Sequence, residues 1–167
     1  MSSDLPEHGS TEMGSLAGSI GKIVPMLCVP DIPATLDWYT AIGFKELGRY
    51  EEDGFVNWGM LSFGKAQIML KLGESRGAND LSLWLYTDRV DDLYRLLSPR
   101  QHDVTQAAPA DDGRLPGIAF VEDLYHPFYG GRQFSIRDLN GYVLVFLQPS
   151  AERGIAHRPE PISGPAR

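Results

Sequence analysis

The chain has 167 residues, a formal net charge of −7, and contents of 43% hydrophobic and 10% aromatic residues. This length suits one well-buried domain and is too short for two domains of ordinary size. The acidic balance argues against a nucleic-acid partner, because binding to phosphates depends on a surplus of Lys and Arg, and it favours a neutral or cationic ligand. Cys28 is the single cysteine, which excludes an intramolecular disulfide and is typical of a reducing compartment.

The two ends of the chain have the composition of disordered tails. Residues 1–21 are rich in Ser, Gly and charged residues, and residues 150–167 combine prolines with small and charged residues. The first residues lack the basic and apolar segments of a secretory leader, and no apolar run reaches the length of a membrane span. We therefore expect a cytoplasmic protein with one domain, residues 22–149, and no contact with a membrane.

The first half of that domain predicts one helix among four strands. Asp31 and Pro33 are typical of a helix start, and Gly43 is typical of a helix end. Short apolar or alternating runs indicate strands on either side of this helix. The predicted strands are 23–29, 44–51, 55–63 and 66–72.

The second half repeats this order after a polar linker. Leu93, Leu96 and Leu97 indicate a helix at 90–97, which Pro99 ends. The two halves, about 22–73 and 81–149, therefore each have the order βαβββ, with a looser pattern in the second half. The fold class is α+β, with two modules whose sheets form a cleft. The predicted strands of the second half are 81–87, 104–107, 117–121, 132–138 and 142–148.

The last hairpin contains Asn140-Gly141, which is the two-residue signature of a type I′ turn. Such a turn pairs Leu139 with Tyr142 and Ile136 with Val145. Because side chains alternate across a strand, Phe134 and Ile136 would then share a face with Val145.

Three segments of the chain resemble the vicinal oxygen chelate superfamily of glyoxalases, extradiol dioxygenases, fosfomycin resistance enzymes and bleomycin resistance proteins. The resemblance covers about residues 22–149 and implies paired βαβββ modules around a cleft. The segments are VPDIPATLDWYTAIGF at 29–44, MLSFGKAQIMLKL at 60–72 and YGGRQFSIRDLNGYVLVF at 129–146.

The positions that hold the metal in this superfamily carry no useful metal ligand here. The resemblance places them at Val24, Met69, Leu81 or Ser82, and Val145. Divalent metals prefer imidazole, thiolate or oxygen anions. The resemblance therefore points to the metal-free bleomycin resistance type, which sequesters a ligand without chemistry, and it implies a homodimer with no cofactor. The segment HPFYGGRQFSIRD at 126–138 is also similar to that type.

Strand alternation then predicts which side chains line the cleft. A two-residue turn between the strands at 55–63 and 66–72 places Trp58 and Met60 on the face of Met69, whereas a three-residue turn would reverse this. In the strand at 81–87, the alternation favours Ser82, Trp84 and Tyr86 for the cleft over Leu81, Leu83 and Leu85, which would face the helix. The predicted ligand-binding residues are Trp58, Met60, Met69, Trp84, Tyr86, Phe128, Tyr129, Arg132, Phe134 and Val145, with no catalytic residue.

Several of these residues also have a structural interpretation. Phe128 and Tyr129 could instead pack at the dimer interface, and Arg132 could tie down its loop through Asp123 or Glu122 rather than bind a ligand carboxylate.

The leading functional hypothesis is a small-molecule-binding protein that sequesters an aromatic or cationic antibiotic, such as a bleomycin-family glycopeptide, in an apolar cleft. A second hypothesis is a metal-dependent lyase, isomerase or dioxygenase whose ligands lie elsewhere, with His126, Glu122, Asp138 and Glu46 as candidates. A third is an accessory binding or immunity domain for a pathway intermediate.

Overall fold

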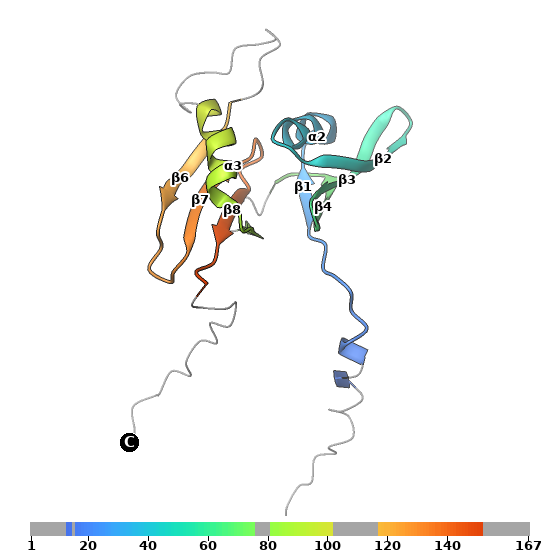
Figure 1. The fold of residues 1–167 in the computed structure, drawn as a ribbon. Coiled ribbons are helices and arrows are strands. Elements are labelled where there is room, and N and C mark those ends of the chain that lie inside the picture. Colours follow the sequence, from blue (N-terminus) through green and yellow to red (C-terminus); the bar gives the residue numbers. More distant parts are fainter. Residues whose placement is uncertain (1–12, 15, 76–80, 102–116, 152–167) are drawn as a thin grey trace, which may run out of the picture.

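The computed structural model of the protein describes residues 13–14, 16–75, 81–101 and 117–151. Two βαβββ modules lie side by side, each a four-stranded sheet with one helix over one face (Figure 1). The α+β class expected from the sequence is therefore confirmed. The predicted strand at 104–107 lies outside the described residues, as does most of both predicted tails.

The first module contains the sheet with strand order β1-β4-β3-β2, in which only β1 and β4 run parallel. Its helix α2 (Ile32–Ala41) begins where predicted, because the Asp31 carboxylate accepts a hydrogen bond from the Ala34 amide at 2.9 Å. Gly43, with a φ of +109°, follows the helix end. The strands are β1 (Met26–Val29), β2 (Lys45–Glu52), β3 (Phe55–Phe63) and β4 (Ala66–Leu72).

The turn between β3 and β4 has two residues, which is the first of the two turn lengths considered from the sequence. Phe63 pairs with Ala66, and Met60 therefore pairs with Met69. The prediction that Trp58 and Met60 share the face of Met69 is confirmed. The opposite face carries the buried side chains that pack against α2.

The second module has the strand order β5-β8-β7-β6, with β5 and β8 parallel. Helix α3 (Val90–Leu97) has the bounds predicted for it, 90–97. It continues into a short 3₁₀ turn, η1 (Ser98–Arg100). The strands are β5 (Ser82–Tyr86), β6 (Ala119–Tyr125), β7 (Arg132–Arg137) and β8 (Val143–Gln148).

The β7–β8 turn differs from its prediction. Asp138 pairs with Tyr142 through its amide at 2.9 Å, so the loop has three residues and only Gly141 has positive φ, at +93°. The Asp138 side chain explains the difference, because its Oδ1 accepts the amides of Asn140 and Tyr142, both at 2.8 Å. Ile136 consequently pairs with Leu144 rather than with Val145.

This one-residue change in register moves Phe134 into the core. Phe134 now pairs with Phe146 on the face that α3 covers, and it is fully buried. Its ring stacks on Phe146 with centroids 4.9 Å apart and on Phe120 at 5.8 Å. The prediction that Phe134 and Ile136 share a face with Val145 was wrong, because a shift of one residue exchanges the two faces of a strand.

The β7–β8 loop also joins the two modules by docking on α2. Tyr39, which is fully buried, donates to Asp138 Oδ2 at 2.9 Å, and Tyr142 donates to the carbonyl of Cys28 at 2.9 Å. Asn140 adds a 3.0 Å hydrogen bond to a hydroxyl on α2. We call this set of contacts the module latch; its side chains are Thr35, Tyr39, Asp138, Asn140 and Tyr142.

Burial raises the pKa of Asp138 above its ordinary value, although hydrogen bonds from Tyr39 and from the loop amides oppose the shift. Burial, followed by the nearby Asp138, also raises the pKa of Tyr39. Tyr39 and Asp138 are 0% and 5% exposed, so neither group faces solvent.

Candidate functional site

Among the described residues, no helix covers the second face of the second sheet, and this face is rich in aromatic side chains. Trp84 pairs with Val145, which pairs in turn with Ser135, so these three share the face opposite α3. Trp84 and Tyr86 are 44% and 57% exposed, whereas Leu83 and Leu85, which alternate with them, pack against the core. The predicted orientation of this strand is confirmed. We call this surface the second open face.

The loop before β7 extends the second open face. The Tyr129 ring lies 6.1 Å from Trp84, and the Phe128 ring lies 5.1 Å from Tyr129. Phe128 is 98% exposed. Large apolar rings in water are unfavourable unless a ligand or partner covers them, so this row of aromatic side chains is a candidate binding surface.

A polar cluster lies beside these aromatic side chains. Glu122 accepts hydrogen bonds from Tyr125 at 3.1 Å and from Ser135 at 3.0 Å, with a longer one from Gln133 at 3.4 Å. Gln133 also donates to the Tyr125 hydroxyl at 2.8 Å and accepts from Tyr129. We call this group the tyrosine–carboxylate cluster: Glu122, Tyr125, Tyr129, Gln133 and Ser135.

The pKa values of Tyr125 and Tyr129 in this cluster are both raised. Burial raises the pKa of Tyr125, and the hydrogen bond to Glu122 raises it further. Burial likewise raises the pKa of Tyr129, against the hydrogen bond with Gln133, which lowers it. Both hydroxyls therefore act as hydrogen-bond donors rather than as bases at neutral pH.

Arg132 ties down the aromatic loop, but through different partners from those predicted. Its Nε donates to Asp91 on α3 at 2.8 Å, and a second nitrogen lies 3.0 Å from His126 Nε2. His126 is held in turn by the Gly131 carbonyl, 2.8 Å from its Nδ1. The pairing of Arg132 with Asp123 or Glu122 was wrong, because the loop turns its side chain toward α3.

Gly131 makes this path of the loop possible. Its φ is +92°, and a Cβ at this position would lie 2.4 Å from the carbonyl oxygen of Gln148. A residue with a side chain would therefore meet backbone, in a conformation that L-residues rarely adopt. The glycine thus sets the position of Phe128 and Tyr129.

The first sheet also has a face that no helix covers within the described part of the chain, which we call the first open face. Met69 lies between Met26 and Met60 on it, and Trp58 lies opposite Lys71. Trp58, Met60 and Met69 are half-buried. These three predicted residues therefore gather on one sheet, while Trp84, Tyr86, Tyr129 and Val145 gather on the other.

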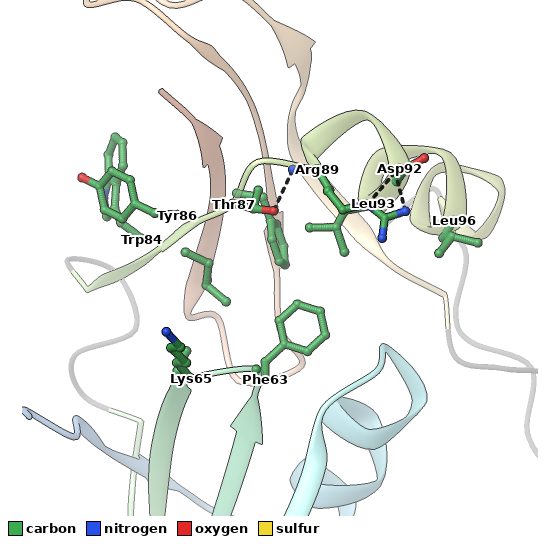
Figure 2. Close-up of a pocket in the computed structure, with 13 residues that line it drawn as sticks. Phe63, Lys65, Trp84, Tyr86, Thr87, Arg89, Asp92, Leu93 and Leu96 are labelled. Atoms are coloured by element: carbon green, nitrogen blue, oxygen red, sulfur yellow. Dashed lines mark hydrogen bonds and ion pairs between the residues drawn. The ribbon is translucent and has the colours of Figure 1, made fainter. Parts of the chain in front are cut away.

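A pocket of about 580 Å³ lies between the modules. Phe63, the last residue of β3, and Lys65 of the β3–β4 turn line it from the first module, and Figure 2 shows the Phe63 ring directed toward Leu93 of α3 across it. Trp84 extends from the side of β5 that faces away from Leu93. It borders both this pocket and a second pocket of about 450 Å³. Volumes of this size suit small molecules.

The superfamily metal does not fit the residues of this chain. Val24 lies before β1, and Met69 and Val145 occupy the middles of their strands; none carries a donor that a divalent metal prefers. Ser82, at the start of β5, offers only a neutral hydroxyl. Within the ranges that the structure describes, no three His, Cys, Asp or Glu side chains are grouped as metal ligands.

The alternative metal ligands suggested by the sequence are each engaged elsewhere. Glu46 forms an ion pair with Arg49 at 2.7 Å, and Asp138 belongs to the module latch. His126 contacts Arg132, and Glu122 lies in the tyrosine–carboxylate cluster. The structure does not gather these four side chains into one site.

Comparison with known proteins gives the class of this chain. The sequence model of the Glyoxalase/Bleomycin resistance protein/Dioxygenase superfamily matches residues 19–146. The chain therefore belongs to this superfamily. No curated protein sequence matches it. No helix among the described residues has the length and apolar character needed to cross a membrane.

Solved structures with the same fold include binding proteins and an enzyme-related protein. The bleomycin-binding protein of bleomycin-producing Streptomyces verticillus, complexed with copper(II)-bleomycin, is 19% identical with a TM-score of 0.58, covering 79% of this chain and 98% of its own. The antibiotic-binding protein TnmS3 of a Streptomyces species is 22% identical with a TM-score of 0.52, covering 79% and 98%. A glyoxalase-related enzyme from Clostridium phytofermentans is 17% identical with a TM-score of 0.57, covering 78% and 96%.

Proposed function

We propose that this protein binds and sequesters a planar aromatic or cationic small molecule, such as a bleomycin-family glycopeptide, without chemical conversion. The observation that carries the proposal is the row of aromatic side chains on the second open face. Trp84, Tyr86 and Phe128 are all exposed there, and Tyr129 bridges two of them. Flat aromatic ligands stack on such surfaces and remove them from water.

The side chains at the possible metal positions support ligand binding rather than metal-assisted catalysis. The residues at the superfamily's metal positions are apolar or neutral, and the tyrosine–carboxylate cluster contains no histidine or cysteine. Two solved structures with this fold are named as binding proteins for bleomycin or for an antibiotic. The proposal therefore includes no cofactor and no catalytic residue.

We also propose that the protein is a cytoplasmic homodimer. In the ranges that the structure describes, two sheet faces carry no helix, one lined by Trp58, Met60 and Met69 and the other by Trp84 and Tyr129. Apposition of the first open face of one copy with the second open face of another would cover both and enclose a ligand between them. Burial of these apolar surfaces would favour the association.

Isothermal titration calorimetry with bleomycin and a panel of planar aromatic cations tests the binding function. We expect saturable heat for at least one compound, and light scattering coupled to size-exclusion chromatography should give the mass of two chains. Absence of saturable heat across the panel would reject the proposal. Elemental analysis of protein purified without chelator separates it from the enzyme alternative, since a stoichiometric divalent metal would favour the enzyme.

A further inference from the structure

We infer that Glu122 is the cation-recognition group of this protein and pairs with a protonated nitrogen of the ligand, while the aromatic rings of the second open face hold the ligand's planar part. This inference rests on the proposed binding function and adds the residue and the charge that select the ligand. It follows from the geometry of the tyrosine–carboxylate cluster.

The carboxylate is held in place by neighbours that cannot easily move. Ser135 and Gln133, which donate to it, are 1% and 2% exposed. A third donor, Tyr125, approaches the other carboxylate oxygen. Hydrogen bonds to an ionised acceptor are strong and directional, so Glu122 is preoriented before any ligand arrives.

The strand itself is distorted at this position. The register of β6 against β7 shifts on both sides of Glu122, between Phe120 and Glu122 and again before Tyr125. Bulges of this kind re-aim a side chain and occur next to functional sites. In this strand the irregularity brings Glu122 opposite Ser135, on the aromatic face rather than the helix face.

The charge of Glu122 has no cationic partner among the residues that the structure describes. The nearby arginine, Arg132, is committed to Asp91, and the ion pairs of the described chain leave Glu122 out. A carboxylate has about four acceptor positions, and three are taken by the cluster. Because Glu122 is solvent-exposed, one remains for an external N–H donor.

The surrounding rings favour a cation as well. Tyr125 and Tyr129 belong to the same cluster, and Trp84 lies 6.1 Å from Tyr129. Aromatic faces attract cations, and the attraction adds to that of the carboxylate. The geometry therefore selects a planar aromatic cation over a neutral ring of the same shape.

A matched pair of probes isolates the charge. 9-Aminoacridine is a cation at neutral pH, and acridine is a neutral ring system of nearly the same size. We expect the full-length chain to bind 9-aminoacridine about tenfold more tightly than acridine in calorimetry, because a charge-assisted hydrogen bond to a preoriented carboxylate is worth about that factor. Equal affinity for the two compounds, or no binding of the cation, would overturn the inference.

Variants then locate the charge. Glu122→Gln should lose about tenfold in affinity for 9-aminoacridine and change acridine binding little. The matched control is Glu52→Gln, which alters the net charge equally at the exposed end of β2 in the other module and should leave both affinities unchanged. If Glu122→Gln behaves like Glu52→Gln while bleomycin or 9-aminoacridine still binds, the inference fails and the proposed function stands. If no compound binds the wild-type chain, both fail.

Discussion

The two modules share one topology, but their open faces have different chemistry. The first open face is built largely from Met26, Met60 and Met69 beside Trp58, and methionine adapts to ligands of varied shape. The second open face combines rings with a carboxylate whose direction is set by the buried donors Ser135 and Gln133. One fold thus provides an adaptable apolar surface in one half and a directional, charged surface in the other.

The largest effect should come from the core beneath the second open face. Phe134→Ala removes a fully buried ring stacked on Phe146, and we expect it to lower the free energy of unfolding by about 3–5 kcal/mol. Urea denaturation followed by circular dichroism measures this loss. Val145→Ala, on the opposite face of the same sheet, removes only two methyl groups and should cost less. Equal losses would show that the Phe134 ring contributes no more to stability than these methyl groups, contrary to its place in the core.

Disruption of the module latch should have the next largest effect on the free energy of unfolding, because the latch joins the two modules. Asp138→Ala leaves the Tyr39 hydroxyl buried without its acceptor and removes the side chain that shapes the β7–β8 loop. We expect a loss of about 1–3 kcal/mol in the free energy of unfolding. Tyr39→Phe, which keeps the loop's own hydrogen bonds, should cost about 1 kcal/mol. If Asp138→Ala costs no more than Tyr39→Phe, the loop does not depend on this carboxylate.

Ligand binding should distinguish the two open faces directly. Trp84→Ala removes the ring that stands beside Tyr129, and we expect about a tenfold loss in affinity for a planar cation, measured by calorimetry. Trp58→Ala should weaken binding less, because the neighbouring methionines can repack around the ligand. A larger loss for Trp58→Ala would reverse the roles assigned to the two faces.

The smallest effect should be the pH dependence of the module latch. Burial raises the pKa of Asp138 above its ordinary 3.8, so between that value and the raised one the folded chain binds more protons than the unfolded chain. Its contribution to the free energy of unfolding is therefore greatest below 3.8 and falls as the pH rises through this window. The difference in stability between the wild type and Asp138→Asn, from urea titrations at several pH values, should fall in the same way. A rise with pH would contradict this sign.

The β3–β4 and β7–β8 hairpins differ in how well the sequence predicts their register. Both contain a glycine in the turn, and the register of β3 with β4 follows correctly from a two-residue turn. The same reasoning fails for β7 and β8, because the Asp138 side chain captures two loop amides and adds a residue to the turn. Asn140-Gly141 is compatible with both turns, so the local sequence alone could not separate them.

The candidate site was predictable only in part. Alternation along β5 places Trp84 and Tyr86 outward, and this is a property of any half-buried strand. The position of Glu122 could not be read in this way, since two register shifts break the alternation of β6 around it. Nor could the pairing of Arg132 with Asp91, which are 41 residues apart in the chain.

The order of the described helices and strands, the helix start at Asp31 and the superfamily resemblance all follow from the amino-acid sequence, because propensity, capping and alternation act over a few neighbouring residues. The tertiary structure decided which residues meet. It moved Phe134 into the core, joined Tyr39 to Asp138, and placed Glu122 among tyrosines. Each of these contacts depends on a register or a bulge, where a shift of one residue changes every neighbour while leaving the local pattern intact.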